Sequence, residues 1–346
     1  MNQLTTSPTC PSTAALLLPD NKSSINRQLL KQRLVRLTGT LLFGIALLAG
    51  AATGHAQTIG IGTTKGGATA QISNAIANTV SANSSVQVRP QAMANTQQYI
   101  PLVNSGKIEL GLANVPQTRY SVSGTGMSEG KPNPDLRMIV TLFPFRAGVL
   151  AATDTGIVTA ADLKGKKLPR FKERALGDYI YRSFLDAAGL TYDDVVSVPA
   201  SNFPTMWKML KEGQIDSAIV AVGSKPAFDF DASLGGVSFV DLGKDSAETT
   251  AANLPGSFVI EVNGKTPGEG DGRHAIGFDY ALFAHKDVAD DVVTEVVRAM
   301  YENPDALQSS SPLWKNFNPA TMGKDVGVDF HPAAIAFYKA QGIWQR

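Results

Sequence analysis

A glycine-containing loop near residue 65 is the feature of this sequence whose residue types could do chemistry. Thr63, Thr64, Lys65, Gly66 and Gly67 follow a short apolar run, and a stretch with helical spacing of Ile72, Ala75, Ile76 and Ala77 comes next. Paired glycines let a ligand approach the backbone closely, and a helix start directs unpaired N–H groups and partial positive charge at that ligand. The loop is therefore a candidate seat for a small anionic or carbonyl-bearing molecule.

Three interpretations of this loop stay open from its residues alone: a structural turn, a binding-protein loop and a nucleotide loop. A GxxxxGK[ST] phosphate loop would need a lysine after Gly67, where the chain has Ala68 and Thr69. A GxGxxG loop starts at Gly60 and Gly62 but has Lys65 at its last glycine. Because neither motif is completed, both nucleotide interpretations are weak.

Other residue patterns typical of catalysis or metal binding are missing from the sequence. His274, His285 and His331 are widely spaced and fit no HExxH or HxH pattern, and no GxSxG motif occurs. Acidic pairs such as Asp290 and Asp291 stand where solvated helix starts are expected. We therefore expect no enzyme activity, no catalytic residues, no metal site and no cofactor.

A repeated pattern indicates how the chain positions the loop. Asn95 begins a helical stretch that Gly106 ends, and a buried strand follows at residues 108–115. Asn202, Gly213 and a strand at residues 215–222 repeat this order with the same spacing. Two explanations of this match stay open: any unit of helix, glycine and strand shows this pattern, or the chain has two lobes of similar construction. We favour two lobes whose helix starts face each other across a cleft.

The second copy carries a basic loop where the first carries glycines. Arg170, Lys172 and Arg174 precede a helix predicted from about Gly177 to Ala188, and Arg146 lies near a predicted crossover. Arginine pairs both oxygens of a carboxylate, so these cations suit an organic anion, and we favour Arg170. The candidate ligand-binding residues are Thr63, Thr64, Gly66, Gly67, Ala68, Asn95, Thr96, Asn114, Arg146, Arg170, Lys172, Arg174, Gly177, Val222, Gly223 and Ser224.

Composition fits a globular protein with a leader segment. Of the 346 residues, 43% are apolar and 18% charged, which allows sizeable cores. The net charge of +1 becomes −3 without residues 1–56, so nucleic acid is not an expected partner. A basic region, an apolar run at residues 41–52 and the series Gly54, His55, Ala56 predict a signal peptide over residues 1–56 and export to the periplasm. An uncleaved anchor is the alternative.

Several motifs in a fixed order resemble a known family. They are IGIGTTKGGATAQISNAIA at 59–77, SGKIELGLANV at 105–115, GIVTAADLKGKKL at 156–168, AAGLTYDDV at 187–195, LKEGQIDSAIVAVG at 210–223 and HPAAIAFYKAQGIW at 331–344. Together they are similar to the extracytoplasmic solute receptors of TRAP transporters, TAXI branch. The resemblance implies a receptor that closes on a small ligand and delivers it to the permease subunits of a TRAP transporter.

We therefore predict an α/β chain with the two-lobed type II periplasmic binding protein fold and two crossover strands as its hinge. The predicted first lobe comprises residues 57–145 and 284–346, and the second comprises 146–283. The expected ligand is a small organic anion, either a carboxylate or an amino-acid-like molecule. The alternatives are an ABC-type receptor of the same fold and a secreted enzyme that uses the glycine-rich loop.

Overall fold

The computed structural model describes residues 57–270 and 272–345. The predicted signal peptide lies outside these residues. In the first part of the chain, each of three parallel strands leads directly into a helix. The elements are β1 (Gln57–Thr64), α2 (Gly67–Asn83), β2 (Val86–Met93), α3 (Thr96–Asn104), β3 (Leu110–Asn114) and α4 (Val115–Ser123). Because β1 pairs in parallel with both β2 and β3, the three helices begin at one edge of the sheet.

The second copy of the predicted repeat builds a similar series of elements. It comprises β5 (Lys167–Arg170), α5 (Leu176–Ala187), β6 (Val196–Pro199), α6 (Phe203–Lys211), β7 (Ser217–Ala221) and α7 (Lys225–Leu234). Both ends of α6 follow those of α3, and both ends of β7 follow those of β3, at the offset that separates Asn202 from Asn95. The repeat read from the sequence is thus a repeat of structure.

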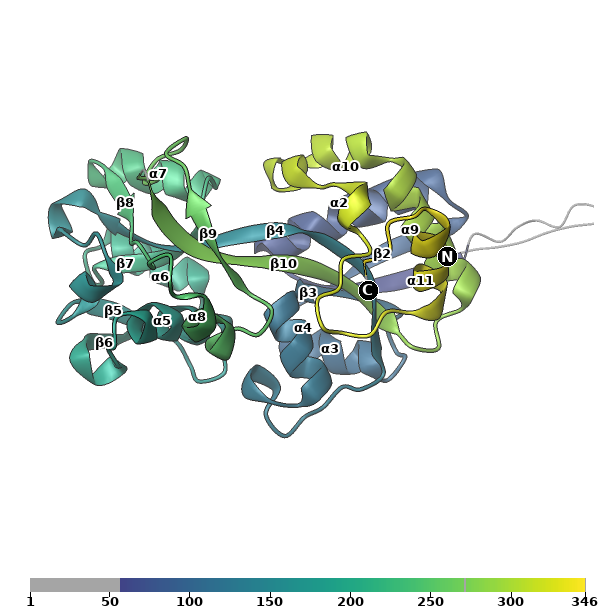
Figure 1. Cartoon of the computed structure of the whole chain (residues 1–346), viewed down its shortest axis with the longest axis horizontal. Coiled ribbons are helices and arrows are strands. Elements are labelled where there is room, and N and C mark those ends of the chain that lie inside the picture. The colour runs from purple at the N-terminus through teal and green to yellow at the C-terminus, as the bar shows by residue number, and fades with distance from the viewer. Residues whose placement is uncertain (1–56, 271, 346) are drawn as a thin grey trace, which may run out of the picture. The chain divides into compact units, whose positions relative to one another are not determined.

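Two long strands connect the two series (Figure 1). They are β4 (Leu136–Ala152) and β10 (Arg273–His285), which pair with each other in antiparallel register. One end of this pair lies in each lobe, since β10 pairs with β3 and with β9 (Phe258–Val262), and β4 pairs with β7 and with β8 (Val237–Phe239). They are the two predicted crossover strands.

Each series packs on its own hydrophobic core, and we name the lobes by these cores. Lobe 1 has a core that includes Ile61, Val103 and Phe283, and lobe 2 has one that includes Phe184, Met206 and Phe239. Lobe 1 also receives the final helices α9 (Asp290–Glu302), α10 (Pro304–Ser310) and α11 (Pro332–Ala340), and lobe 2 receives α8 (Ala247–Asn253). The apolar face of α9 is buried at Val292, Val293, Val296, Val297 and Met300.

The two buried strands predicted at residues 108–115 and 215–222 are shorter at both ends, because β3 comprises Leu110–Asn114 and β7 comprises Ser217–Ala221. Strand β2 runs through Pro90 to Met93. Strand β2 lies at the edge of the sheet. A proline is tolerated there because its missing N–H can fall on the side that has no neighbouring strand. Strand β3 ends at Asn114, and Val115 already belongs to α4, because the Asn114 side chain accepts a hydrogen bond from the Gln117 N–H and caps the helix.

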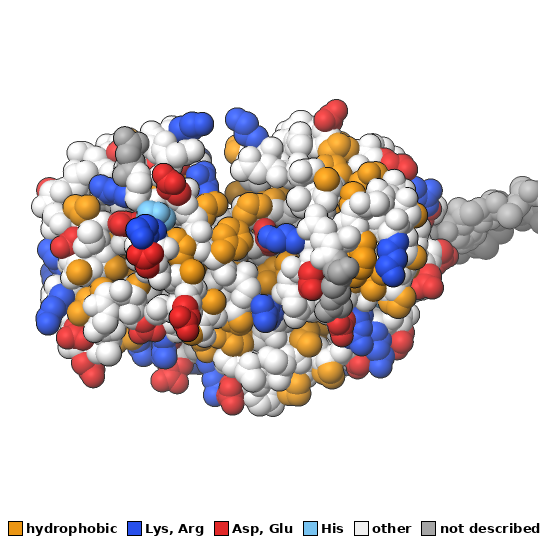
Figure 2. Space-filling model, viewed as in Figure 1, with side chains coloured by type: hydrophobic (Ala, Val, Ile, Leu, Met, Phe, Trp, Pro, Cys, Tyr) orange, Lys and Arg blue, Asp and Glu red, His pale blue; other side chains and the backbone are white. Residues whose placement is uncertain are grey.

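Within the described residues, no helix combines the length and apolar character needed to cross a membrane. In the view of Figure 2, basic and acidic side chains are interspersed, and a notch at the upper edge separates the two lobes. This face therefore shows no continuous basic stripe of the kind that nucleic acids bind.

Candidate ligand-binding site

The candidate site combines strand ends and helix starts from both lobes. Helices α2, α3 and α4 begin shortly after the ends of β1, β2 and β3, and α5, α6 and α7 follow β5, β6 and β7 in the same way. Three of these helices have a proline in their first turn, which removes an N–H that would lack a partner. The remaining unpaired N–H groups make such an edge suitable for an anion.

In lobe 1 the glycine loop leaves its backbone open. The hydroxyl of Thr63 donates to the Thr69 carbonyl and accepts from Ser73, and the Thr64 hydroxyl donates to the Gly66 carbonyl. The side chains of Thr63, Thr64 and Ser73 thus hold the loop in place through hydrogen bonds. Apart from the adjacent residues and the backbone of the same helix, no heavy atom of the described residues lies within 4 Å of where a Cβ would stand at Gly66 or Gly67. The backbone at these glycines is therefore free to meet a ligand, and the two threonine hydroxyls already have partners.

A buried amide network joins the next two strand ends. The Asn114 side chain donates to the Gln117 side-chain oxygen at 2.6 Å, and the Gln117 amide donates to the Thr96 hydroxyl at 2.9 Å. Asn114 and Thr96 were predicted ligand contacts, and Gln117 was not. Its place in the first turn after a capping asparagine was the available signal. Asn95 begins α3, is exposed and makes no side-chain cap bond.

In lobe 2, Arg170 is held by the protein itself. Its guanidinium lies 3.3 Å from the buried Asp178 carboxylate and 3.6 Å from the centre of the Tyr192 ring. Asp178 is also paired with Arg182 at 2.8 Å. Burial, followed by the charge of Asp178, raises the pKa of the Tyr192 hydroxyl. Arg170 therefore has a structural role that the sequence did not reveal, because its partner Asp178 lies further along the chain, inside a helix.

Lys172 differs from Arg170 in being exposed and in forming no ion pair with any described residue. It lines a pocket of about 410 Å³ at the ends of β5 and β6. The other lining residues are Arg170, Phe171, Pro199, Ala200, Ser201 and Thr205. Gly177 shapes this pocket, because a Cβ there would stand 2.6 Å from the Phe171 ring. Among the predicted cations, Lys172 is the one available to an anionic ligand in this pocket.

Arg174 has an unusual backbone conformation. Its φ is +69°, and among the described residues it is the one non-glycine residue with positive φ. Gly67, its counterpart in the first copy of the repeat, has a φ of +79°. Both lobes therefore place a left-handed residue near the helix start, since Gly67 is the first residue of α2 and Arg174 stands two residues before α5. Lobe 2 accepts arginine there at a cost of about 1 kcal/mol. The side chain lies near Tyr179. Burial raises the pKa of the Tyr179 hydroxyl, and the charges of Arg182 and Arg174 offset part of that rise.

The predicted residue Ala68 lies in the first turn of α2 and packs against the core of lobe 1. Four other predicted residues, Arg146, Val222, Gly223 and Ser224, come together where β4 meets β7. Arg146 forms an ion pair with Glu269 at 3.7 Å, and its carbonyl accepts from the Val222 N–H. Gly223 has a φ of +74°, and a Cβ there would lie 3.2 Å from the Arg146 guanidinium. The buried Ser224 hydroxyl has no hydrogen-bond partner among the described residues.

A direct contact between the lobes was not predicted. The Tyr120 hydroxyl, on α4 of lobe 1, donates to the Asn253 carbonyl of lobe 2 at 2.8 Å, and its ring contacts Tyr179. Met127, which follows α4 in sequence, is buried in the core of lobe 2. Burial, and then Tyr179, raises the pKa of Tyr120 to about 12. No local sequence signal marks such a contact, because Tyr120 and Asn253 are far apart in the chain.

Solved structures share this architecture. A binding protein component of an ABC phosphonate transporter from Pseudomonas aeruginosa matches with a TM-score of 0.50 and 8% identity, over 73% of this chain and 78% of that one. The periplasmic aliphatic sulphonate binding protein SsuA from Escherichia coli matches with a TM-score of 0.47 and 17% identity, over 82% of this chain and 78% of that one. At 8% identity, the first of these matches bears on the fold alone.

The fold is that of the type II periplasmic binding proteins, as the sequence predicted. Its two parallel strand series, crossed by β4 and β10, are the features on which that assignment depends. The match to a sequence family is broader than any one motif and extends from the third residue of β1 to the residues after α11. Residues 59–342 match the NMT1-like family, and the chain therefore belongs to that family.

Proposed function

We propose that this protein is an extracytoplasmic solute receptor that binds a small organic anion and delivers it to a TRAP-type permease, as the TAXI-like motifs imply. It binds its solute without catalysing a reaction. The observation that carries the proposal is the paired arrangement of strand ends, three in each lobe, with the exposed Lys172 at one of them. Such an arrangement supplies N–H groups and a cation for one anionic group.

The proposal gives separate roles to the cations of lobe 2. Lys172 contacts the anion, since no acid of the described residues pairs with it. Arg170 stiffens the loop through Asp178 and Tyr192. A charge-assisted bond to Lys172 is worth about 1.5–3 kcal/mol, so its loss weakens binding by roughly tenfold to a hundredfold.

An ABC-type receptor is the second candidate, and the Pseudomonas aeruginosa phosphonate-binding structure favours it as a member of this fold from an ABC system. Both candidates need the same cleft and the same export. They differ in the permease that accepts the loaded receptor. Uptake by vesicles that contain a TRAP permease, compared with vesicles that contain an ABC permease, therefore distinguishes them.

Export is part of the proposal and rests on the leader sequence. Cleavage after Ala56 would leave Gln57, the first residue of β1, as the mature terminus. Terminal sequencing of protein recovered from periplasm should then begin near Gln57. Recovery of functional protein with residues 1–56 intact would contradict it. The lobe boundaries at residues 145/146 and 283/284 stay predictions.

The main test identifies the ligand and then removes one charge. Mass spectrometry of material carried through purification should reveal a small organic anion, and calorimetry should give its affinity. Lys172→Met should weaken binding by at least about tenfold. The control Lys208→Met removes an exposed charge of the same lobe and should leave binding unchanged. A neutral ligand, or equal affinity of both variants and parent, would refute the proposal. Scattering should also show a smaller radius of gyration with ligand.

A further inference from the structure

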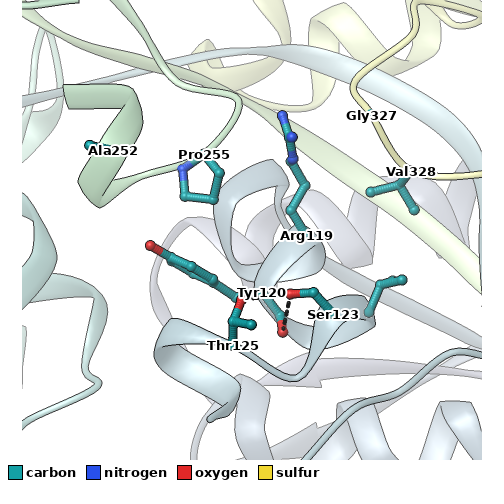
Figure 3. Close-up of a pocket in the computed structure, with 9 residues that line it drawn as sticks. Arg119, Tyr120, Ser123, Thr125, Ala252, Pro255, Gly327 and Val328 are labelled. Carbon is teal, nitrogen blue, oxygen red and sulfur yellow. Dashed lines mark hydrogen bonds between the residues drawn. The ribbon is translucent and has the colours of Figure 1, made fainter. Parts of the chain in front are cut away.

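A second pocket lies between the lobes, and none of the predicted ligand contacts lines it (Figure 3). Its volume is about 350 Å³, which lies in the range of small-molecule sites. It is lined by Arg119, Tyr120, Val122, Ser123, Thr125, Ala252, Pro255, Gly327 and Val328. Helix α4 and the segment near residue 327 belong to lobe 1, and residues 252 and 255 to lobe 2, so both lobes form the walls.

Arg119 is the one charged residue that lines this pocket. It is partly buried and forms no ion pair with any described residue. Two glycines in left-handed conformation flank it. A Cβ at Gly256 of lobe 2 would lie 3.2 Å from its Cδ, and one at Gly327 of lobe 1 would lie 3.1 Å from its Cζ. Glycines at both positions leave the guanidinium room, and its charge is uncompensated by any lining residue.

The rest of the lining is apolar or already hydrogen-bonded. Val122, Ala252, Pro255 and Val328 supply apolar surface. Figure 3 shows Ala252, Pro255 and Val328 around the same space as Arg119. The hydroxyls of Ser123 and Thr125 bond to each other at 2.7 Å. The pocket thus offers one cationic group and an apolar wall, and none of its lining residues is acidic.

We propose that this pocket is a second binding site, for a small amphiphilic anion that has one carboxylate and a short branched or aromatic body. The carboxylate pairs with Arg119, whose planar guanidinium matches its two oxygens. The body packs on the apolar walls of both lobes. Because the walls come from both lobes, an occupant stabilises this arrangement of the lobes over any arrangement that separates them.

The contacts beside the pocket explain why it is built only in this arrangement. The Tyr120 hydroxyl is bonded to Asn253, the residue after the lining residue Ala252, and Met127 is buried in the lobe 2 core. Gly126 allows the Tyr120 ring to pack on the turn that carries Met127, since a Cβ at Gly126 would overlap the ring. Lobe separation would break these contacts and open the pocket.

The test uses benzoate and isovalerate as probes and inorganic phosphate as an anion without an apolar body. Saturation-transfer NMR and calorimetric titration of the mature protein should show that the two carboxylates bind and that phosphate binds at least tenfold more weakly. Arg119→Met should weaken benzoate binding by at least tenfold. Arg119→Lys keeps the charge, and its affinity for benzoate should fall by less than about tenfold. This variant is the comparison that keeps a cation at the same position. The control Arg89→Met alters an exposed arginine of β2 and should change nothing.

Lys172→Met separates this proposal from the proposed transport site. Benzoate binding that depends on Arg119 and is indifferent to Lys172 supports a second site. Benzoate binding that Lys172→Met abolishes, benzoate binding that is equal in Arg119→Met and parent, or no binding of either carboxylate to the parent would each overturn it. Failure of the second site leaves the anion dependence on Lys172 unaffected, so the two proposals fail separately.

Discussion

Replacing Arg170 with methionine tests whether this residue supports lobe 2 or holds the ligand. The variant removes the ion pair with the buried Asp178 and the cation–π contact with Tyr192. Contacts to a charged group contribute about 1.5–3 kcal/mol and a cation–π contact about 0.5–1 kcal/mol. Since Arg182 still pairs with Asp178, we expect the lower end of the sum, a loss of about 2 kcal/mol in the free energy of unfolding.

Urea denaturation followed by circular dichroism measures this loss, and calorimetry with the identified ligand measures binding. Arg182→Met should cost less than about 1 kcal/mol, because Arg182 is 43% exposed. The double variant should cost about 3–5 kcal/mol, more than the two single losses together, because it leaves the buried Asp178 carboxylate unpaired. Adding Asp178→Asn should recover part of that loss.

The result that refutes this reasoning is specific. If Arg170→Met unfolds at the same urea concentration as the parent and no longer binds the ligand, Arg170 is a ligand contact and Asp178 is not its main partner. If Arg170→Met is destabilised and binds with unchanged affinity, the structural role stands and Lys172 remains the candidate cation.

Two further predictions follow from the same contacts. Folding raises the pKa of Tyr120 from about 10 to about 12, so this group contributes stability that is complete below pH 10 and is lost as pH rises through 12. Tyr120→Phe should lower the free energy of unfolding by about 1 kcal/mol and remove that part of the pH dependence of urea unfolding. An unchanged pH profile in this variant would contradict the prediction. Gly177→Ala should displace Phe171, lower the free energy of unfolding by about 1–3 kcal/mol and weaken ligand binding. Gly66→Ala places its methyl group in open space and should change stability little. Equal effects of the two variants on stability would count against the packing argument.

The predicted elements were reliable where the signal is local. Asn202 caps α6 and Gly213 follows it with positive φ, as the spacing of capping residue and glycine indicated. Strand β10 was recognisable as a buried strand because its run of apolar residues is continuous. Strand β2 can continue through Pro90 because it lies at the edge of the sheet, and edge position is a property of the sheet and not of the segment.

The sequence predicted where the candidate site lies, and it did not predict which of its side chains form ion pairs within the protein. Helix starts after strands follow from local pattern, so the loop at Gly66 and Gly67 and the loop at Lys172 were both found. Which cation is free depends on what the fold brings beside it. Arg170 and Lys172 look alike in the sequence, yet only the first meets a buried carboxylate.

The sequence by itself determined the α/β class, the repeat of helix, glycine and strand, and the two crossover strands, because periodicity, caps and glycine stops act over a few residues. Only the tertiary structure decided that Arg170 is paired with Asp178, that Arg119 has no such partner among the described residues, and that Tyr120 reaches Asn253 in the other lobe. Charge pairing and contact between lobes depend on distances between side chains far apart in the chain, and no local pattern fixes those distances.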